Sequence, residues 1–463
     1  MRLVILGLDC LGPEVLDPAS RSFMPRLAAL RQQGLGGVLQ SVLPPITVPA
    51  WSCMLTGRDP GELGLYGFKN RSSPSRPELV RANARWMRSP RLWEELDSAR
   101  RPTITVGMPL TSPVAPLRAG HLVCGFEGAL DGPSPWWPET LGEDFDELKD
   151  YRFDIQEFRH AALEEAADLA AQMTLGRFRL FRRLLRERPW ELATLHEIAP
   201  DRMHHLFWRD HDPQHPRHQP GSPFADAIVD YYRLLDQAVG ELVDELPPET
   251  AVLVASDHGA TAMHGAVCLN EILLESGLLR LRRSPEQPHR LSPQEVDWQH
   301  TRAWAAGGYF GRIFLNLRGR EREGTVPRSD APALLRELRD LFGELELGDG
   351  RVLHNRVVSP GEIYRRVRGI PPDLMIFFAG ERWRAVSTVG HRRRWMEGND
   401  QGVDHANHSR DGIFALRVPG REPNPWTRAS LLDIAPTLRP LLRLPADPSL
   451  QGHDLLNDLR RAA

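Results

Sequence analysis

The sequence has few of the features that mark secreted, membrane-embedded or nucleic-acid-binding proteins. It holds only 4 cysteines in 463 residues, with no CxxC pair, and this usage favours buried, reduced thiols over a disulfide framework. No apolar run approaches the ~18 residues of a membrane helix, and the first one ends at once in Asp9, which is atypical of a signal peptide. We therefore expect a cytoplasmic protein that does not associate with a membrane.

An excess of charge of either sign is also missing. The chain has 58 basic and 61 acidic residues, a formal net charge of -3, and gives no electrostatic reason to expect a nucleic acid polymer as partner. Hydrophobic residues make up 41% of the sequence, which is enough to build a large core. At 463 residues the chain exceeds the length at which a single core keeps growing, so we expect either one large domain with insertions or two domains; the pattern predicts no particular oligomeric state.

Strand and helix patterns alternate along the first hundred residues. The apolar run 4–8 predicts a buried parallel strand, and 23–30 has helical apolar spacing with an early proline and a glycine stop at Gly34. A second helix is expected at 90–96 and a second strand at 103–106. This order predicts an α/β fold with a mostly parallel sheet and helices on both faces.

Two stretches depart from the alternation. Residues 110–188 hold a Pro/Gly/Trp-rich segment followed by a long helical run from 161 to 188, and we interpret them as an inserted helical cap. Residues 270–400 are rich in arginine- and proline-containing turns and predict a second, irregular insertion.

Acidic and imidazole side chains stand at the ends of two predicted strands. Asp9 ends the run 4–8, and Asp257, His258 and Gly259 follow the apolar run 251–256. Open α/β sheets place their chemistry at the carboxyl ends of strands, and these oxygen and nitrogen donors suit divalent cations. Asp201 and His205, four residues apart after another strand-like segment, would lie on one side of a helical turn and bind one ion together.

Thr47 is the candidate nucleophile. It stands at a turn that enters a short helix, where free backbone N–H groups favour a bound anion. A threonine hydroxyl is a poor nucleophile until a base or a metal removes its proton, and no general base is adjacent. A metal held by Asp9, Asp257 and His258 is the expected activator, although a threonine before Val-Pro is more commonly a turn or capping residue.

The chain resembles the alkaline phosphatase superfamily, and within it the type I phosphodiesterase and nucleotide pyrophosphatase group. The resemblance covers most of the chain and is carried in order by the blocks 5–9, 45–51, 256–259, 407–414 and 432–438, with Gln451 and Gly452 near the end. It implies a single catalytic domain over residues 1–463, folded as an alkaline-phosphatase-like α/β/α sandwich with a mostly parallel central sheet and inserted cap segments.

The resemblance also implies a division of metal ligands. Asp9, Thr47, Asp257 and His258 would hold one divalent cation, and Asp201, His205 and His408 the other; His408 is chosen over nearby histidines only by its place in the matching block. Zinc is the first expectation for both ions, with manganese or iron also compatible with such donors. The implied reaction is attack of the Thr47 oxygen on phosphorus, with a phosphothreonine intermediate, in a small phosphorylated metabolite or nucleotide-type substrate.

Other activities of the same superfamily stay open. They are phosphomonoester hydrolysis and a phosphomutase or phosphotransferase reaction; a non-catalytic, metal-stabilised binding protein is the alternative of another class. A sulfatase is disfavoured because Thr47 cannot be converted to formylglycine and Trp51 stands where sulfatases have arginine. Ala50 replaces an asparagine that contacts a phosphate oxygen in the eukaryotic nucleotide pyrophosphatases, so nucleotide specificity is not implied.

Overall fold

The fold is organised around one nine-stranded sheet. The computed structural model describes residues 1–16, 23–75, 77–128 and 133–457. The strand order is β22-β2-β21-β9-β1-β8-β5-β6-β7. The strands are β1 (Leu3–Leu8), β2 (Leu35–Gln40), β5 (Thr103–Gly107), β6 (His121–Gly125), β7 (Trp136–Trp137), β8 (Leu192–Glu197), β9 (Ala251–Ala255), β21 (Asp411–Arg417) and β22 (Asn424–Ser430).

The sheet is mostly parallel, as the sequence predicts. Strands β6, β5, β8, β1 and β9 run parallel to one another, and β2 is parallel to β22. Strand β21 pairs antiparallel with both β9 and β2, and β7 pairs antiparallel with β6. The centre of the sheet, where β1 lies between β8 and β9, is therefore parallel and covered on both faces.

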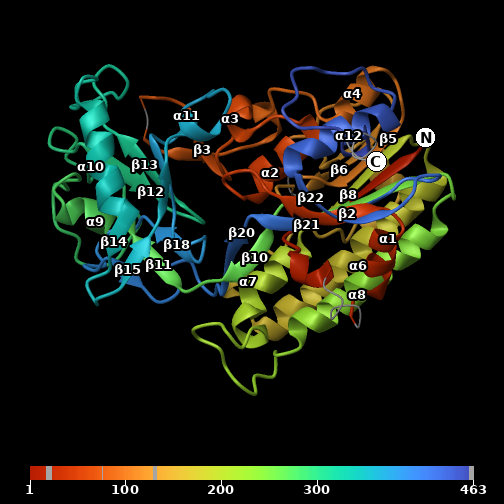
Figure 1. Ribbon diagram of the computed structural model, residues 1–463, viewed down its shortest axis with the longest axis horizontal. Coiled ribbons are helices and arrows are strands. Elements are labelled where there is room, and N and C mark those ends of the chain that lie inside the picture. The colour runs from red at the N-terminus through yellow and green to blue at the C-terminus, as the bar shows by residue number, and fades with distance from the viewer. Residues whose placement is uncertain (17–22, 76, 129–132, 458–463) are drawn as a thin grey trace.

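Helices cover both faces of the sheet, which gives the α/β/α sandwich (Figure 1). Alternate residues of β1 enter two separate cores: Val4, Leu6 and Leu8 face one, while Leu3 and Ile5 face the other. This is the period-two alternation of a strand that is buried on both sides. The first face carries α1 (Pro25–Gln32), α6 (Leu163–Glu187), α7 (Ala199–His211) and α8 (Ala227–Glu245); the second carries α2 (Thr47–Thr56), α4 (Leu92–Ser98) and α12 (Ile434–Leu441).

A second group of strands and helices lies at one end of the molecule, on the left in Figure 1. It has its own hydrophobic core. Strand β10 (Gly259–Ala262), directly after β9, pairs with β20 (Ala406–Ser409) between this group and the main sheet. The group contains the sheet β12 (Ala303–Ala306), β13 (Gly311–Leu315), β17 (Leu374–Phe377) and β16 (Arg356–Val358), with α9 (Leu269–Glu275) and α10 (Ala331–Gly343).

The two segments expected as insertions have different surroundings. Most of 270–400 belongs to the second group of elements. In 110–188, the long helix α6 packs on α7 and α8 and contributes Phe178, Phe181 and Leu184 to the core beneath the sheet. The division into one domain with two inserted segments stays a prediction. In the described residues, no helix combines the length and apolarity that crossing a bilayer requires.

Candidate metal centre

The ends of β1 and β9 bring the first three predicted ligands together. The two strands are adjacent and parallel, with Gly7 opposite Ala255. Asp9 follows β1 directly, and Asp257 and His258 follow β9. Because parallel neighbours end at the same edge of a sheet, these side chains emerge side by side.

The other predicted ligands reach the same place from three different elements. Thr47 is the first residue of α2, Asp201 and His205 lie on α7, and His408 lies on β20, where it is opposite Ala260 of β10. All seven predicted residues are at most 1% exposed. Two groups have one ligand atom per residue within 4.8 Å of one another: Asp9, Asp257 and His258, and Asp201, His205 and His408.

The Asp9 carboxylate has one oxygen with hydrogen-bonding neighbours and one oxygen without a hydrogen-bond partner among the described residues. Oδ2 of Asp9 accepts a hydrogen bond from the Trp51 indole N–H at 3.0 Å and lies 2.8 Å from Nε2 of His196. Oδ1 of Asp9 is buried without a hydrogen-bond partner among the described residues and lies 3.5 Å from Nε2 of His258. An unpaired buried carboxylate oxygen is costly unless a cation or proton compensates it.

The other two carboxylates repeat this arrangement. Asp201 Oδ2 accepts from Arg202 at 2.6 Å, whereas its Oδ1 makes no hydrogen bond in the part of the chain described and lies 3.3 Å from Nε2 of both His205 and His408. The backbone N–H of Cys10 donates to Oδ1 of Asp257 at 3.4 Å. Oδ2 of Asp257 has no hydrogen-bond partner among the described residues and lies 3.3 Å from Nε2 of His258. These donor sets therefore fit bound cations.

The three histidines all direct Nε2 toward the carboxylates of the centre. Each ring places Nδ1 against a backbone carbonyl: His205 at 3.1 Å from Ala406, His258 at 3.1 Å from Gly259, and His408 at 2.8 Å from Pro45. An Nδ1 that donates to oxygen fixes the neutral tautomer with its lone pair on Nε2, the usual arrangement of a metal-binding histidine.

The protonation of these groups agrees with that tautomer. Burial, with His408 next in effect, lowers the pKa of His258 to about 3, and burial lowers that of His408 to about 4. Burial opposes ionisation of Asp201 as well, but His205, His408 and Arg202 hold the pKa of its carboxyl well below the usual range. Burial and then the carboxylates of Asp9 and Asp201 raise the pKa of Asp257. At neutral pH the imidazoles of His258 and His408 are thus neutral donors.

Thr47 lies beside His258, which contacts His408 and so connects the two groups of candidate metal ligands. The rings of His258 and His408 are stacked with centroids 3.8 Å apart, which joins the groups into one centre. The Thr47 hydroxyl oxygen is 3.5 Å from Nε2 of His258. As the first residue of α2, Thr47 stands where helix N–H groups lack intrahelical partners.

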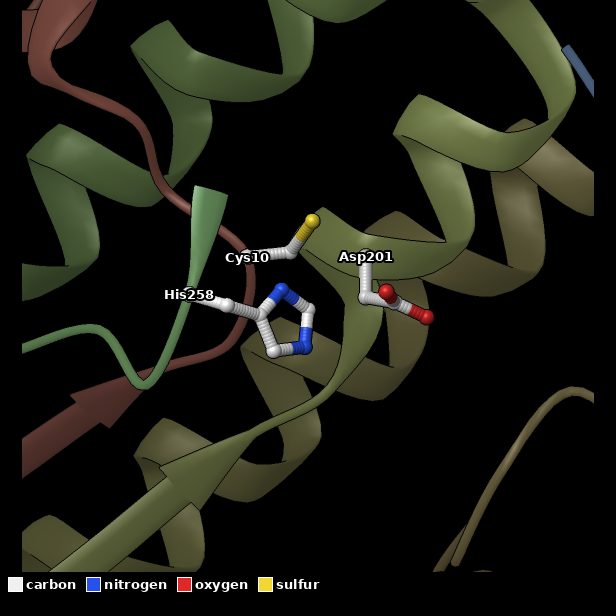
Figure 2. A group of neighbouring side chains, drawn as sticks. All are labelled: Cys10, Asp201 and His258. Carbon is white, nitrogen blue, oxygen red and sulfur yellow. The ribbon is translucent and has the colours of Figure 1, made fainter. Parts of the chain in front are cut away.

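Cys10 also lies at the centre, beside Asp201 and His258 (Figure 2). One ligand atom from each of these three residues falls within 4.8 Å of the others. Burial, and then the carboxylates of Asp201, Asp9 and Asp257, raise the pKa of the Cys10 thiol well above its usual value. The thiol is therefore neutral, and all four cysteines are free and buried, as the sequence predicts.

Several residues that support the predicted ligands had not been identified from the sequence. His196 contacts Asp9, and Asp404 lies 2.8 Å from Nδ1 of His205. The Tyr309 ring stacks on His408 with centroids 3.8 Å apart. His196 had a usable signal, because it is a polar residue near the end of strand β8; Asp404 and Tyr309 lie in irregular segments with no local pattern.

Trp51 is a residue of the core that lies behind the centre. It is 1% exposed, and its ring lies against β1: a Cβ on Gly7 would come within 2.6 Å of it. Glycine at this position lets α2 approach the strand closely, and the approach brings the Trp51 N–H to Asp9.

A cavity of about 1640 Å³ opens beside the centre. Ile46 and Val48, the neighbours of Thr47, line it together with Phe68, Phe126 and Tyr309. Both sequence neighbours of Thr47 therefore line a space large enough for a metabolite.

The sequence profile of the type I phosphodiesterase / nucleotide pyrophosphatase family matches residues 3–408. The chain belongs to this family, whose members are phosphoric ester hydrolases of the alkaline phosphatase superfamily. No curated protein sequence matches the chain.

Solved structures share the fold. Phosphonoacetate hydrolase from Sinorhizobium meliloti, in complex with phosphonoformate, is similar with a TM-score of 0.58 and 17% identity, over 92% of each chain. Murine ectonucleotide pyrophosphatase / phosphodiesterase 5 is similar with a TM-score of 0.54 and 14% identity, over 98% of this chain and 97% of its own. The human protein of that name gives 0.55 and 14%, over 97% and 96%. These similarities establish the alkaline-phosphatase-like α/β fold.

Proposed function

We propose that this protein is a metal-dependent phosphodiesterase that cleaves a small phosphorylated metabolite through a phosphothreonine intermediate on Thr47. The observation that carries the proposal is the position of the Thr47 oxygen, 3.5 Å from Nε2 of His258 and beside the contact between two sets of metal-binding side chains. Family membership supports the reaction class.

The proposed cofactors are two divalent cations. Asp9, Thr47, Asp257 and His258 would hold one, and Asp201, His205 and His408 the other. Zinc suits the mixture of imidazole and carboxylate donors, which manganese and iron also tolerate. When bound, such ions supply Lewis-acid stabilisation of the entering and leaving oxygens. The unpartnered carboxylate oxygens, and the three rings that place Nδ1 against a backbone carbonyl and leave Nε2 for the centre, support this assignment.

The side chains then have distinct tasks. Thr47 Oγ forms a bond to phosphorus as the bond to the leaving alcohol breaks, and water later attacks the same phosphorus to free the threonine. Pro49 has no N–H, so the amides of Thr47 and Val48 at the start of α2 are the donors available to the nonbridging oxygens. Trp51 and His196 both contact Oδ2 of Asp9 and hold its carboxylate in position.

The cavity favours a diester over a monoester. A diester carries a second substituent on phosphorus, and the space beside Ile46 and Val48 has room for one. Ala50 is fully buried and has no polar side-chain atom, so the proposal does not extend to nucleotide specificity. We place the reaction in the cytosol, which the four free cysteines support.

The test is hydrolysis of bis(4-nitrophenyl) phosphate and of 4-nitrophenyl phosphate by the metal-loaded chain. The diester is expected to be the better substrate, and Thr47→Ala to lower kcat by at least about 10³-fold with little change in metal content. Thr56→Ala, on the same helix with its hydroxyl bonded to Ser52, is the matched control.

Other results would redirect the assignment. Hydrolysis of the monoester alone would indicate a phosphatase, and phosphate transferred to an added sugar phosphate would indicate a phosphotransferase. An inert but metal-loaded protein, or full activity of Thr47→Ala, would contradict the proposal.

A further inference from the structure

Four cationic side chains gather on the wall of the cavity beside Thr47. They are Lys69, Arg81, Arg290 and Arg312. Lys69 lies on β3 (Lys69–Arg71) and is directly opposite Arg81 on β4 (Leu79–Arg81). Like charges placed opposite each other on an antiparallel pair repel.

The four differ from the other arginines of the cavity. Arg202 pairs with Asp154 at 2.6 Å, Arg159 pairs with Asp404 at 2.9 Å, and Arg384 also pairs with Asp404. Within residues 1–16, 23–75, 77–128 and 133–457, none of the four makes an ion pair with a carboxylate. The cluster is therefore an uncompensated concentration of positive charge.

Arg312 is the clearest member. It donates to the carbonyl oxygens of Lys69 and Gly307, each at 2.8 Å, and burial lowers its pKa to about 10. Its Nε is buried without a hydrogen-bond partner in the described chain. Holding a guanidinium this way is unfavourable unless an anion compensates it.

The charges of the cluster also act on one another. The pKa of Lys69 is lowered by burial and then by Arg290, Arg81 and Arg312. Lys69 is partly buried, whereas Arg81 and Arg290 are exposed. A bound anion would relieve this repulsion.

Most carboxylates of the cavity wall are engaged elsewhere. Asp154 pairs with Arg202, Glu127 accepts from the Thr111 backbone N–H at 2.7 Å, and Asp400 accepts from Thr388. Glu78 and Glu157 also line the cavity and are exposed. The field at the cluster is therefore set mainly by the cations.

The cluster adjoins the reaction site. A Cβ placed on Gly67 would lie 3.6 Å from an Nη of Arg312 and 4.0 Å from Cδ1 of Ile46, and Ile46 immediately precedes Thr47. One molecule in the cavity would thus reach both places.

We propose that Lys69, Arg81, Arg290 and Arg312 form a second anion subsite, which binds a phosphate group of the substrate remote from the scissile one. The substrate class is then a metabolite that carries two separated phosphate groups. This inference rests on the proposed function in one respect, that the scissile phosphate binds beside Thr47.

The test compares AMP with adenosine 3′,5′-bisphosphate by isothermal calorimetry on the metal-loaded Thr47→Ala chain. Both probes carry a 5′-phosphate, and only the second carries another. The bisphosphate is expected to bind at least about tenfold more tightly, an advantage of about 1.4 kcal/mol, and the advantage should shrink as ionic strength rises.

Lys69→Gln combined with Arg290→Gln is expected to reduce that advantage below about threefold. Arg290→Gln alone, at an exposed position, should reduce the affinity advantage of the bisphosphate in part. This single variant replaces the double variant in the test if the double variant does not fold. Arg336→Gln, exposed on α10 and away from the cavity wall, is the matched control and should keep the full advantage.

The subsite would be overturned if the two probes bound with equal affinity or if neither bound. It would also be overturned if the Lys69 and Arg290 variants kept the full preference for the bisphosphate. Diester turnover by the wild-type chain is measured separately. Its absence would contradict the proposed hydrolase without deciding the binding comparison.

Discussion

His205 and His408 face each other through their Nε2 atoms, which are 3.2 Å apart. Nδ1 of each ring lies against a backbone carbonyl, of Ala406 and of Pro45, and in the neutral form with Nδ1 protonated each Nε2 carries a lone pair. Two lone pairs cannot hydrogen-bond to each other, and burial disfavours protonation of His408. A cation between the rings resolves the arrangement, and this is the physical basis of the metal assignment.

Replacing a ligand is expected to remove metal. Asp257→Asn should lower occupancy of one site and His408→Ala that of the other, each to about one ion per chain, as measured by elemental analysis. Asp373→Asn, which alters a carboxylate paired with Arg320 away from the centre, should keep both ions. Full occupancy in either ligand variant would remove that residue from the ligand set.

Asp404 is expected to act through His205. Its carboxylate lies 2.8 Å from Nδ1 of His205, so Asp404→Asn weakens the hydrogen bond that orients the ring. Metal affinity should fall roughly 10- to 100-fold, measured by chelator competition. An unchanged affinity would show that the Ala406 carbonyl, 3.1 Å from the same nitrogen, is sufficient.

The indole N–H of Trp51 is expected to position Asp9. Trp51→Phe keeps an aromatic ring but removes the donor at 3.0 Å, which should cost about 1–3 kcal/mol of stability and lower kcat roughly tenfold. Trp93→Phe is the matched control, since Nε1 of Trp93 is buried without a partner in the described residues. Equal kcat in the two variants would contradict the role of Trp51.

Gly7 is expected to set the distance between β1 and α2. In Gly7→Ala the new methyl would meet the Trp51 ring at 2.6 Å, and overpacking should lower the free energy of unfolding by about 1–3 kcal/mol. Gly176→Ala on α6, where no neighbouring atom lies within 4 Å, should instead stabilise by up to about 1 kcal/mol. Denaturant unfolding of both variants checks this; a Gly7→Ala protein as stable as wild type would contradict it.

His215 is expected to contribute to acid sensitivity. Its Nδ1 accepts from the Arg217 backbone N–H at 3.0 Å, and its Nε2 donates to the His405 carbonyl at 3.1 Å. Burial, and then Arg217, lower its pKa from 6.5 to about 4. The unfolded chain therefore binds the extra proton first, and stability present above pH 6.5 is lost as the pH falls toward about 4.

The measurement is the free energy of unfolding against pH in the presence of a chelator, so that metal release does not contribute. His215→Gln should reduce the slope in this window by up to about 1.4 kcal/mol per pH unit, the effect of one proton. His354→Gln, at a side chain that is 79% exposed, should leave the slope unchanged. If the free energy of unfolding of the two variants changed with pH at the same slope, the proposed contribution of His215 to acid sensitivity would be contradicted.

The sequence predicted the parts of the centre that local rules determine. Asp9 and Asp257 follow apolar strands, and the spacing of Asp201 and His205 suits one helical turn, so period and strand ends were sufficient to find them. His408 could be selected only by family resemblance, because its position depends on the pairing of β20 with β10, a contact between distant segments.

The supporting residues could not be found in the same way. Asp404 reaches His205 from an irregular segment, and Tyr309 reaches His408 from another. Neither position has a periodic pattern, since both depend on how the second group of elements packs against the sheet. The burial of Trp51 likewise follows from the missing side chain of Gly7, which only the packed structure reveals.

The most direct test of the account is anomalous X-ray diffraction from crystals of the metal-loaded protein. Two peaks are expected, one at about 2 Å from donor atoms of Asp9, Asp257 and His258 and one at that distance from Asp201, His205 and His408, with the Thr47 oxygen beside the first. A single peak, or metal bound only outside these side chains, would contradict it.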